Sequence, residues 1–282
     1  MRTFAGPVSS RFRLLVFASI LLTLETSADM LSELQAITDA LVEQGSPAAL
    51  LYVEDPVQGT NALAAGVRNR NTMTAAQPTD RFRIASNSKT FTAAATLLLC
   101  EEGLLSLTNT VAEILPEHDV PSNTVITVSN LLTHTSGLPD HNNDTDYFDT
   151  RSFENPVTNF SPEEVFEVVR SLPSHFAPGA EYRYCDTGFY ILHLIIQKVN
   201  TNGWSYADFI RHRLIEPLGL NDTFVPDAGN GYLRFVPGDH IRGYMVTNET
   251  TGALRDVTDV GQSWDLGCGG MWGSSGDAGG MG

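Results

Sequence analysis

Ser86 and Lys89 are the residues of this sequence whose types and spacing first suggest chemistry. They stand three positions apart at the start of residues 88–102, a segment with helical periodicity. Side chains three apart on a helix share a face, so the lysine amine can reach the serine hydroxyl. A serine hydroxyl becomes a good nucleophile when a neighbouring base takes its proton. The pair predicts a nucleophile, Ser86, with Lys89 as its base, although the spacing also fits a helix cap followed by a solvated lysine.

Lys89 can act as a base only if its pKa is lowered. Burial or positive neighbours lower a lysine pKa, and the positive field at a helix N-terminus acts in the same direction. The sequence contains one other lysine, Lys198. A lysine at this spacing from a serine therefore stands out against the composition.

Tyr184 is a third candidate, because it lies just before a strongly apolar helical segment, residues 187–199. A turn that leads into a helix N-terminus often presents functional groups. A tyrosine near a cationic lysine can share its proton and pass one to a leaving group. The alternative is that Tyr184 is an aromatic core residue, as we expect for Tyr182 and Phe189.

The elements that must position these residues follow from apolar periodicity. The N-terminal part predicts a helix followed by a β-hairpin, and the middle of the chain is mostly helical. From residue 229 onward the chain is rich in glycine and is predicted to be loop. The predicted helices are residues 31–44, 88–102, 127–134, 161–170, 187–199 and 205–215, the hairpin strands are 48–53 and 61–66, and 82–84 is a short extended piece.

Length and charge restrict the class of protein. The 282 residues suffice for one sizeable domain or two small ones, and 42% hydrophobic residues is typical of a globular protein. The formal net charge is −16. This charge argues against nucleic acid and against anionic lipid as partners, since both need a basic face.

The first 28 residues have the features of an export signal. Arginines at positions 2, 11 and 13 precede an apolar run over residues 14–24, and small residues at 26–28 offer a cleavage site. We predict a signal peptide, residues 1–28, and a secreted or periplasmic location. The alternative is an uncleaved membrane anchor, although the run is shorter than the roughly 20 residues that a spanning helix needs.

Cysteine and histidine patterns give no sign of a metal site. Three cysteines leave at least one unpaired within a monomer. The histidines at positions 118, 134, 141 and 175 have no partner at zinc-like spacing. We therefore expect no metal and no organic cofactor. We also expect His134 to shape its loop rather than to take part in chemistry.

Five segments together resemble one family. They are FRIASNSKTFTA (82–93), LLTHTSGLPD (131–140), YCD (184–186), EPLGLNDT (216–223) and GGM (269–271). In this order they resemble the serine β-lactamase and penicillin-binding-protein family, in the branch of class C β-lactamases, D-alanyl-D-alanine carboxypeptidases and related esterases. The resemblance extends over about residues 31–277.

The resemblance implies an α+β, β-lactamase-like fold, with an antiparallel sheet flanked by helices and a mostly helical domain. Residues 29–282 would form one hydrolase domain, with 29–80 as the helix and hairpin of the α/β part and 81–228 as the helical part. Ser86 would attack an acyl carbonyl, Lys89 would accept its proton, and Tyr184 would relay a proton to the leaving group and help to activate the deacylating water.

Asp186 departs from the family pattern, because it stands where the family has the asparagine of Tyr-x-Asn. An amide can donate a hydrogen bond to a substrate carbonyl, whereas a carboxylate can only accept one. Asp186 is thus a candidate substrate-binding residue with altered contacts. It can also pair with Lys89, which would raise the lysine pKa and weaken Lys89 as a base.

The family's third motif, Lys-Thr-Gly or His-x-Gly on a strand that lines the site, does not follow Tyr184 in these 282 residues. We therefore expect a C-terminally truncated domain that lacks the C-terminal strands of the sheet. That strand would supply one of two oxyanion donors, and losing one typically costs about 100- to 1,000-fold in rate. Whether this chain is active is thus an open question.

The leading prediction is a monomeric serine hydrolase that forms an acyl-enzyme through Ser86. It would act on a small-molecule or peptide amide or ester, most like a D-alanyl-D-alanine carboxypeptidase or a β-lactamase-related peptidase. One alternative is an esterase that acts on small esters. Another is a non-catalytic pseudoenzyme or binding protein, which the missing third motif favours.

Overall fold

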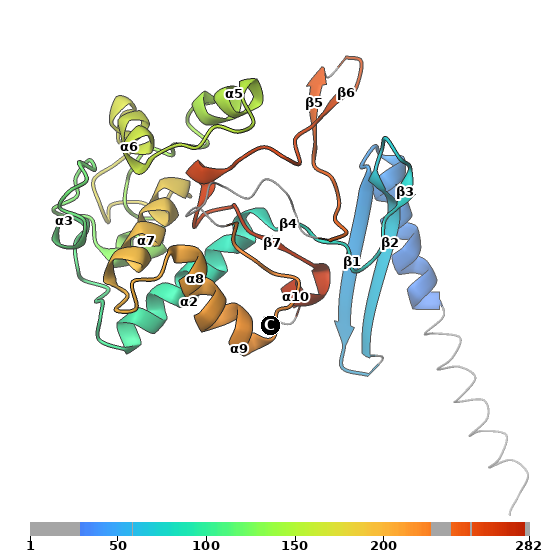
Figure 1. Ribbon diagram of the computed structural model, residues 1–282, viewed down its shortest axis with the longest axis horizontal. Coiled ribbons are helices and arrows are strands. Elements are labelled where there is room, and N and C mark those ends of the chain that lie inside the picture. Colours follow the sequence, from blue (N-terminus) through green and yellow to red (C-terminus); the bar gives the residue numbers. More distant parts are fainter. Residues whose placement is uncertain (1–28, 58, 227–237, 249, 280–282) are drawn as a thin grey trace, which may run out of the picture. The chain divides into compact units, whose positions relative to one another are not determined.

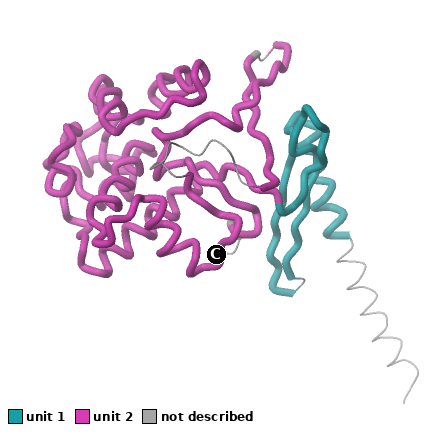
Figure 2. Tube along the Cα trace, in the orientation of Figure 1, with its two compact units in different colours: residues 1–79 teal, residues 80–282 magenta. Residues whose placement is uncertain are grey.

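The computed structural model describes residues 29–57, 59–226, 238–248 and 250–279. The chain divides into two compact units, residues 1–79 and residues 80–282 (Figure 2). The predicted signal peptide, residues 1–28, lies outside the described residues. In the part of the chain that is described, no helix is long and apolar enough to cross a membrane.

The first unit contains the predicted helix and hairpin. Residues 29–43 are helical. The strands β1 (Ala48–Asp55), β2 (Gly59–Asn69) and β3 (Thr74–Ala75) form an antiparallel sheet in the order β1-β2-β3. The end of the helix packs closely against the sheet at Gly66. A Cβ added at this position would fall 2.3 Å from the Pro47 carbonyl oxygen and 3.0 Å from a Val42 methyl group, so the close approach needs a glycine.

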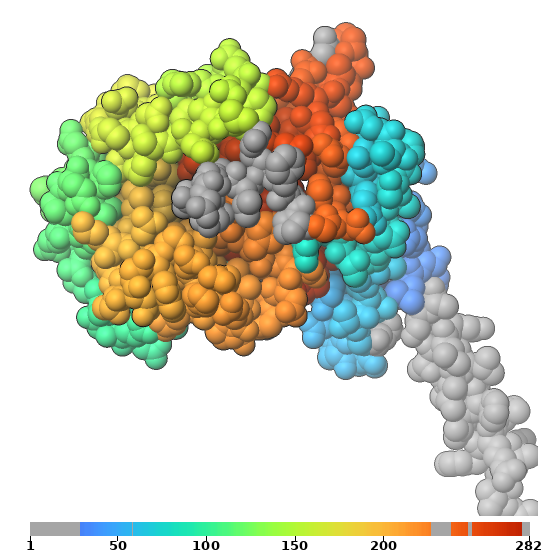
Figure 3. Space-filling view, viewed as in Figure 1, coloured from blue at the N-terminus to red at the C-terminus, as the bar shows by residue number. Residues whose placement is uncertain are grey.

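The second unit is built mainly from helices (Figure 1). In the space-filling view α5, α6, α8 and α9 form much of its visible surface (Figure 3). The helices are α2 (Ser88–Glu101), α3 (Val111–Ile114), α4 (Val128–Leu132), α5 (Tyr147–Glu154), α6 (Pro162–Ser171), α7 (Asp186–Val199), α8 (Tyr206–Ile210) and α9 (Glu216–Leu218), with a π-helical turn, Arg211–Ile215, between the last two.

Helix starts in this unit follow from local sequence. Thr110, Thr127 and Ser161 each accept a hydrogen bond from the backbone N–H three residues on, and the residue there returns one to the cap N–H. Such capping boxes satisfy donors that the helix itself leaves free. They confirm the helix predicted from residue 161 and place α4 within the predicted 127–134.

Helix α7 forms the centre of the hydrophobic core. Its side chains are apolar nearly all round, and Ile191, Leu192, Ile195 and Ile196 are fully buried. Helices α2, α4 and α8 pack against it. The sequence prediction of a buried helix over residues 187–199 is thus confirmed, and the fold is α+β.

The prediction of loop from residue 229 onward is wrong for part of the segment that is described. Strands β5 (Tyr244–Asn248) and β6 (Ala253–Asp256) form a hairpin, and β7 (Trp272–Gly273) pairs antiparallel with β4 (Phe82–Arg83). The short helix α10 (Ser275–Gly279) follows. These strands are too short for a periodicity signal, and the partner of β7 lies far away in the sequence.

Arg83 ties the segment before β7 to β4. Its guanidinium donates to the carbonyl oxygens of Thr258 and Val260 at 2.9 and 2.8 Å and to the Gln262 side chain. The same guanidinium lies 4.9 Å from the centre of the Trp272 ring. Residues 258–272 are thereby fixed beside the turn that carries Ser86.

Leu99 and Leu97 offer a matched test of this core, since both lie in α2. Leu99 is fully buried, whereas Leu97 is 51% exposed. We expect Leu99→Ala to lower the free energy of unfolding by about 2–5 kcal/mol, because it removes buried contacts and leaves a cavity. Leu97→Ala should change it by about 0.5 kcal/mol or less. Urea unfolding of both variants checks this, and equal losses would show that α2 does not pack as described.

Candidate active site

A strained turn presents Ser86 at the start of α2. Ala85 has a φ of +46°, a conformation uncommon outside glycine. The Ser88 hydroxyl donates to the Ala85 carbonyl oxygen at 2.7 Å and accepts the Met271 N–H at 3.2 Å. Strain of this kind persists where the surroundings over-determine it and is frequent at functional sites. The segment before β7 thus holds the turn that carries Ser86.

The structure brings Ser86, Lys89 and Tyr184 together. The Ser86 Oγ lies 2.6 Å from the Tyr184 hydroxyl, and the Lys89 Nζ donates to the same Oγ at 3.3 Å. The Lys89 Nζ also lies 4.7 Å from the centre of the Tyr184 ring. A hydroxyl with two proton-carrying neighbours at these distances can lose its proton as it attacks a carbonyl carbon.

His134 fixes the position of Tyr184. Its ring stacks on the Tyr184 ring, with centres 4.6 Å apart, and its Nδ1 accepts the Cys185 N–H at 3.1 Å. Burial lowers the pKa of His134, and the nearby Lys89 charge lowers it further. The ring is therefore neutral near pH 7 and can accept this hydrogen bond. This geometry fits the predicted role of His134 in shaping its loop.

Lys89 donates to three acceptors at once. Besides Ser86, it contacts the Asp186 Oδ1 at 2.6 Å and the Cys268 carbonyl oxygen at 2.7 Å. Burial by itself lowers the pKa of Lys89, but Cys268 and the Asp186 carboxylate outweigh this effect. The pKa of Lys89 is therefore raised above its ordinary value. Because burial also raises the pKa of the Cys268 thiol well above its ordinary value, Asp186 is the negative charge that faces Lys89 at neutral pH.

Asp186 occupies the first turn of α7 and is almost fully buried. Its Oδ2 accepts hydrogen bonds from the side-chain amides of Asn142 and Asn143 at 3.0 and 3.1 Å. Burial alone would raise the pKa of Asp186, but the Lys89 charge and the hydrogen bonds lower it below its ordinary value. The carboxylate has no hydrogen bond on Oδ1 other than the ion pair, and that contact satisfies it.

Sequence reasoning missed four groups of this site. Asn142 and Asn143 bind the Asp186 side chain, the Asp140 carboxylate accepts the Asp186 N–H at 3.0 Å, and Cys268 supplies a carbonyl oxygen. The polar run DHNND at 140–144, directly after a Gly-Leu-Pro turn, was a signal for the first three. The Cys268 carbonyl had none, because a backbone oxygen has no signature in the sequence.

Among the described residues, no group of three histidines, cysteines or acids could hold a metal ion. His141, a candidate by residue type, is buried and bonded instead to the Thr187 hydroxyl and the Trp264 carbonyl oxygen, at 3.0 and 2.9 Å.

Residues 34–281 match the sequence model of the Beta-lactamase family. The chain belongs to this family. Members of the family are serine hydrolases, and the match covers both structural units and all the residues described around Ser86.

Curated relatives of this Beta-lactamase family member are about one-third identical to it within the matched region. Penicillin-binding protein 4* of Bacillus subtilis is 34% identical over 146 residues, and Protein flp of Staphylococcus aureus is 34% identical over 161 residues. The matches cover 51% and 55% of the chain. The matched region spans about 30% of the length of each relative.

Solved structures share the fold over most of the chain. A D-stereospecific amidohydrolase from Streptomyces superposes with a TM-score of 0.74 at 28% identity, over 86% of this chain and 69% of that one. An octameric penicillin-binding protein homologue from Pyrococcus abyssi gives 0.70 at 26% identity, over 89% and 55%. D-amino acid amidase from Ochrobactrum anthropi gives 0.72 at 25% identity, over 87% and 68%.

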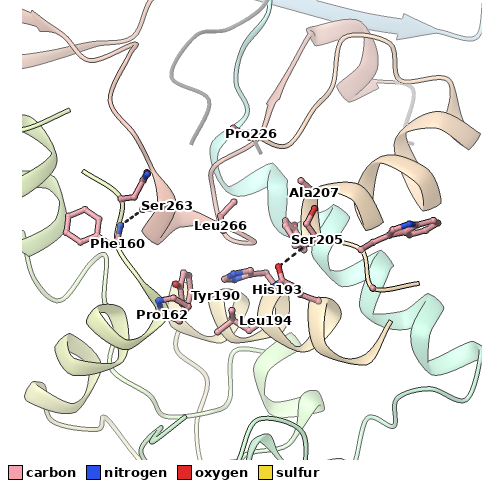
Figure 4. A pocket seen from close by; sticks show the side chains of 15 residues that line it. Phe160, Pro162, Tyr190, His193, Leu194, Ser205, Ala207, Pro226, Ser263 and Leu266 are labelled. Carbon is pink, nitrogen blue, oxygen red and sulfur yellow. Dashed lines mark hydrogen bonds between the residues drawn. The ribbon is translucent and has the colours of Figure 1, made fainter. Parts of the chain in front are cut away.

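A cavity of about 560 Å³ lies along another face of α7 in this family member (Figure 4). Its lining includes Tyr190, His193, Leu194 and Tyr206 but none of Ser86, Lys89 or Tyr184. The His193 Nδ1 is buried without a hydrogen-bond partner among the described residues, and burial lowers the pKa of His193 to about 3. The folded protein thus holds this ring neutral.

His193 should make stability depend on pH. Between about pH 6 and pH 3.5 the unfolded chain, with an ordinary histidine pKa near 6.5, binds a proton that the folded chain does not. Stability from this residue is therefore lost as the pH falls, by about 1.4 kcal/mol per pH unit. His193→Gln should reduce the slope of unfolding free energy against pH by this amount, as measured by urea unfolding between pH 5.5 and 4.5. Parallel curves for the two proteins would contradict the assignment.

Proposed function

We propose that this chain is an acyl-transfer serine hydrolase that forms an acyl-enzyme through Ser86. The observation that carries the proposal is the contact of one serine oxygen with two proton-handling groups, Tyr184 at 2.6 Å and Lys89 at 3.3 Å. Lys89 lies in α2, and Ser86 and Tyr184 lie in the turns that lead into α2 and α7, two helices that pack in the core. Catalytic groups on rigid elements are held in a productive geometry without further ordering.

The reaction follows from these contacts. Ser86 Oγ attacks the carbonyl carbon of an amide or ester, and its proton passes to a neighbouring group as the new C–O bond forms. The tetrahedral adduct then loses the amine or alcohol, which takes a proton from Tyr184, and the acyl group remains on Ser86. Water repeats the sequence and releases the acid, with Tyr184 helping to remove the proton from water.

Amides are the favoured substrate class, with a D-alanyl-D-alanine carboxypeptidase or related peptidase as the leading candidate. The support comes from the relatives. One curated relative is described as a penicillin-binding protein, and two similar structures are described as a D-stereospecific amidohydrolase and a D-amino acid amidase. Since the matched region spans about 30% of the curated relatives, their activity is brought to this chain as part of the proposal.

We also propose a secreted or periplasmic location, supported by the basic and then apolar residues 1–24. An extracytoplasmic enzyme of this kind would meet peptide or small-molecule amides outside the cell. We retain a monomer as the proposed state, although the Pyrococcus abyssi homologue is described as octameric.

Ser86→Ala tests the proposed nucleophile. We expect a fluorescent penicillin to label the wild-type protein covalently and Ser86→Ala to abolish the labelling, because the substitution removes the oxygen to which the acyl group would be bonded. Ser171→Ala, which alters an exposed serine at the end of α6, should label like the wild type. Gel fluorescence and intact mass measure this. Turnover of a chromogenic short-chain ester without labelling would favour an esterase, and neither signal from folded protein would favour a non-catalytic protein.

Tyr184→Phe tests the proton relay. Removing the hydroxyl should slow acylation of Ser86 about 100- to 10,000-fold, the usual contribution of a positioned acid or base. Tyr182→Phe is the matched control, because Tyr182 lies two residues earlier and its side chain is 69% exposed. Stopped-flow labelling rates measure both. Equal rates for Tyr184→Phe and the wild type would remove Tyr184 from the mechanism.

A further inference from the structure

Three oxygens surround the Lys89 Nζ, and their chemistry bears on its protonation state. An ammonium group has three protons and no lone pair, whereas a neutral amine has two protons and one lone pair. The contacts with Asp186, Cys268 and Ser86, at 2.6, 2.7 and 3.3 Å, use three donors. Two of these oxygens, those of the Asp186 carboxylate and the Cys268 carbonyl, can only accept a hydrogen bond, whereas the Ser86 hydroxyl could also donate one to a neutral amine. The buried carboxylate contact at 2.6 Å is therefore what favours the ammonium form of Lys89.

Asp186 is itself held in its charged form. Both asparagine amides, from Asn142 and Asn143, donate to its Oδ2, which leaves Oδ1 for Lys89. The carboxylate also sits in the first turn of α7, where the helix field favours negative charge. Hydrogen bonds to both oxygens and a favourable field offset the cost of burying a charge. If Asp186 were protonated, its added hydrogen would face groups that are already donors: the two asparagine amides at Oδ2 or the Lys89 amine at Oδ1.

The other ionisable groups around Lys89 form no ion pair with it in the described part of the chain, and Asp265 is only partly ionised at neutral pH. From the segment before β7, burial raises the pKa of Asp265 to about 7 and raises the pKa of the Cys268 thiol. From the loop after α4, burial lowers the pKa of both His134 and His141. From the turn before α7, the Tyr184 ring faces the Nζ. Asp186 is thus the carboxylate in direct contact with Lys89.

We propose that Asp186 is a positioning residue that keeps the proton on Lys89, so that the Ser86 proton leaves through Tyr184 and Lys89 acts as a fixed positive charge. This inference refines the proposed function and depends on it for its catalytic consequence. As Ser86 Oγ bonds to the carbonyl carbon, its proton moves to the Tyr184 oxygen, and the Tyr184 proton moves to the leaving nitrogen or oxygen. The Lys89 ammonium keeps its three protons and stabilises the negative charge that develops on Ser86.

An asparagine at position 186 would remove this effect. It could accept a hydrogen bond from Lys89 through its amide oxygen but would carry no charge. Burial would then act on Lys89 without an opposing carboxylate and would favour the neutral amine. The difference between Asp and Asn at this position therefore decides whether Lys89 serves as a cation or as a base.

The small number of lysines allows a direct test. Incorporation of [13Cε]lysine gives two signals, from Lys89 and Lys198, and Lys198→Arg assigns them. In the wild-type chain we expect the Lys89 signal to stay at its ammonium position up to at least pH 10.5, about the ordinary midpoint of lysine. In Asp186→Asn the same signal should titrate at least about one pH unit lower than in the wild type.

Asp144→Asn is the matched control. It makes the same change on the loop that carries the two asparagines, at a carboxylate that pairs with His175 and Arg183 and accepts the Asp140 N–H. It should leave the Lys89 titration within about 0.5 pH unit of the wild type, since it removes no direct contact with the ammonium. An equal shift in both variants would show a general field effect and would overturn the role given to Asp186. A wild-type Lys89 that titrates below pH 9 would also overturn it, even if no variant folds.

A kinetic readout separates this inference from the proposed function. Tyr184→Phe should slow acylation by a chromogenic ester about 100-fold or more in the wild-type background, but by less than about 10-fold in Asp186→Asn, where Lys89 can accept the proton. Equal penalties would overturn the inference. Because the titration needs no turnover, loss of Ser86 labelling would refute the proposed function while leaving the charge state of Lys89 measurable.

Discussion

The buried contact between Lys89 and Asp186 is the interaction on which the arrangement of the site depends. It joins the first turn of α2 to the first turn of α7, and neither side chain is more than 9% exposed. Breaking a buried pair by removing one partner typically costs about 3–5 kcal/mol, because the other charge is left uncompensated. The surrounding groups reduce this cost: the Cys268 carbonyl oxygen accepts from Lys89, and two asparagine amides donate to Asp186.

The backbone around this pair is held in sparsely populated conformations. Ala85, directly before Ser86, and His134, under the Tyr184 ring, both have positive φ values without being glycine. Each is over-determined by its neighbours: Ser88 binds the Ala85 carbonyl oxygen, and His134 is fixed by the Cys185 N–H and the stacked Tyr184 ring. Packing of α2 and α4 on α7 thus fixes the turns that present Ser86 and Tyr184.

The sequence predicted the parts of this structure that have local causes. The helix from Ser161 begins with a capping box, and α7 follows from an apolar run, so both could be located from neighbouring residues. The spacing of Ser86 and Lys89 and the position of Tyr184 before α7 made these three side chains candidates, the family resemblance decided in their favour, and the structure brings them together. The pairing of Lys89 with Asp186, raised where Asp186 departs from the pattern of the family that the sequence resembles, is present at 2.6 Å.

What escaped prediction has causes that are distant in the chain. The β4–β7 pairing joins Arg83 to Trp272, and neither two-residue strand has a periodicity of its own. The Cys268 carbonyl reaches Lys89 because Arg83 holds residues 258–262 in place. Asn142 and Asn143 matter only because Asp186 is folded against them. Local sequence patterns indicate which side chains are candidates for the site, and long-range packing determines which of them come into contact.

Charge explains why one substitution within the family pattern can change the chemistry of the whole site. The chain has 33 acidic and 17 Lys and Arg residues, and beside Ser86 the charges of Lys89 and Asp186 offset each other in a buried pair. In such a site a single proton alters the net charge, and low-dielectric surroundings amplify the effect. A carboxylate at position 186 favours a lysine that stabilises negative charge on Ser86, whereas an amide would favour a lysine that removes its proton. One side chain cannot serve both roles in the same step, so the residue that contacts Lys89 selects between them.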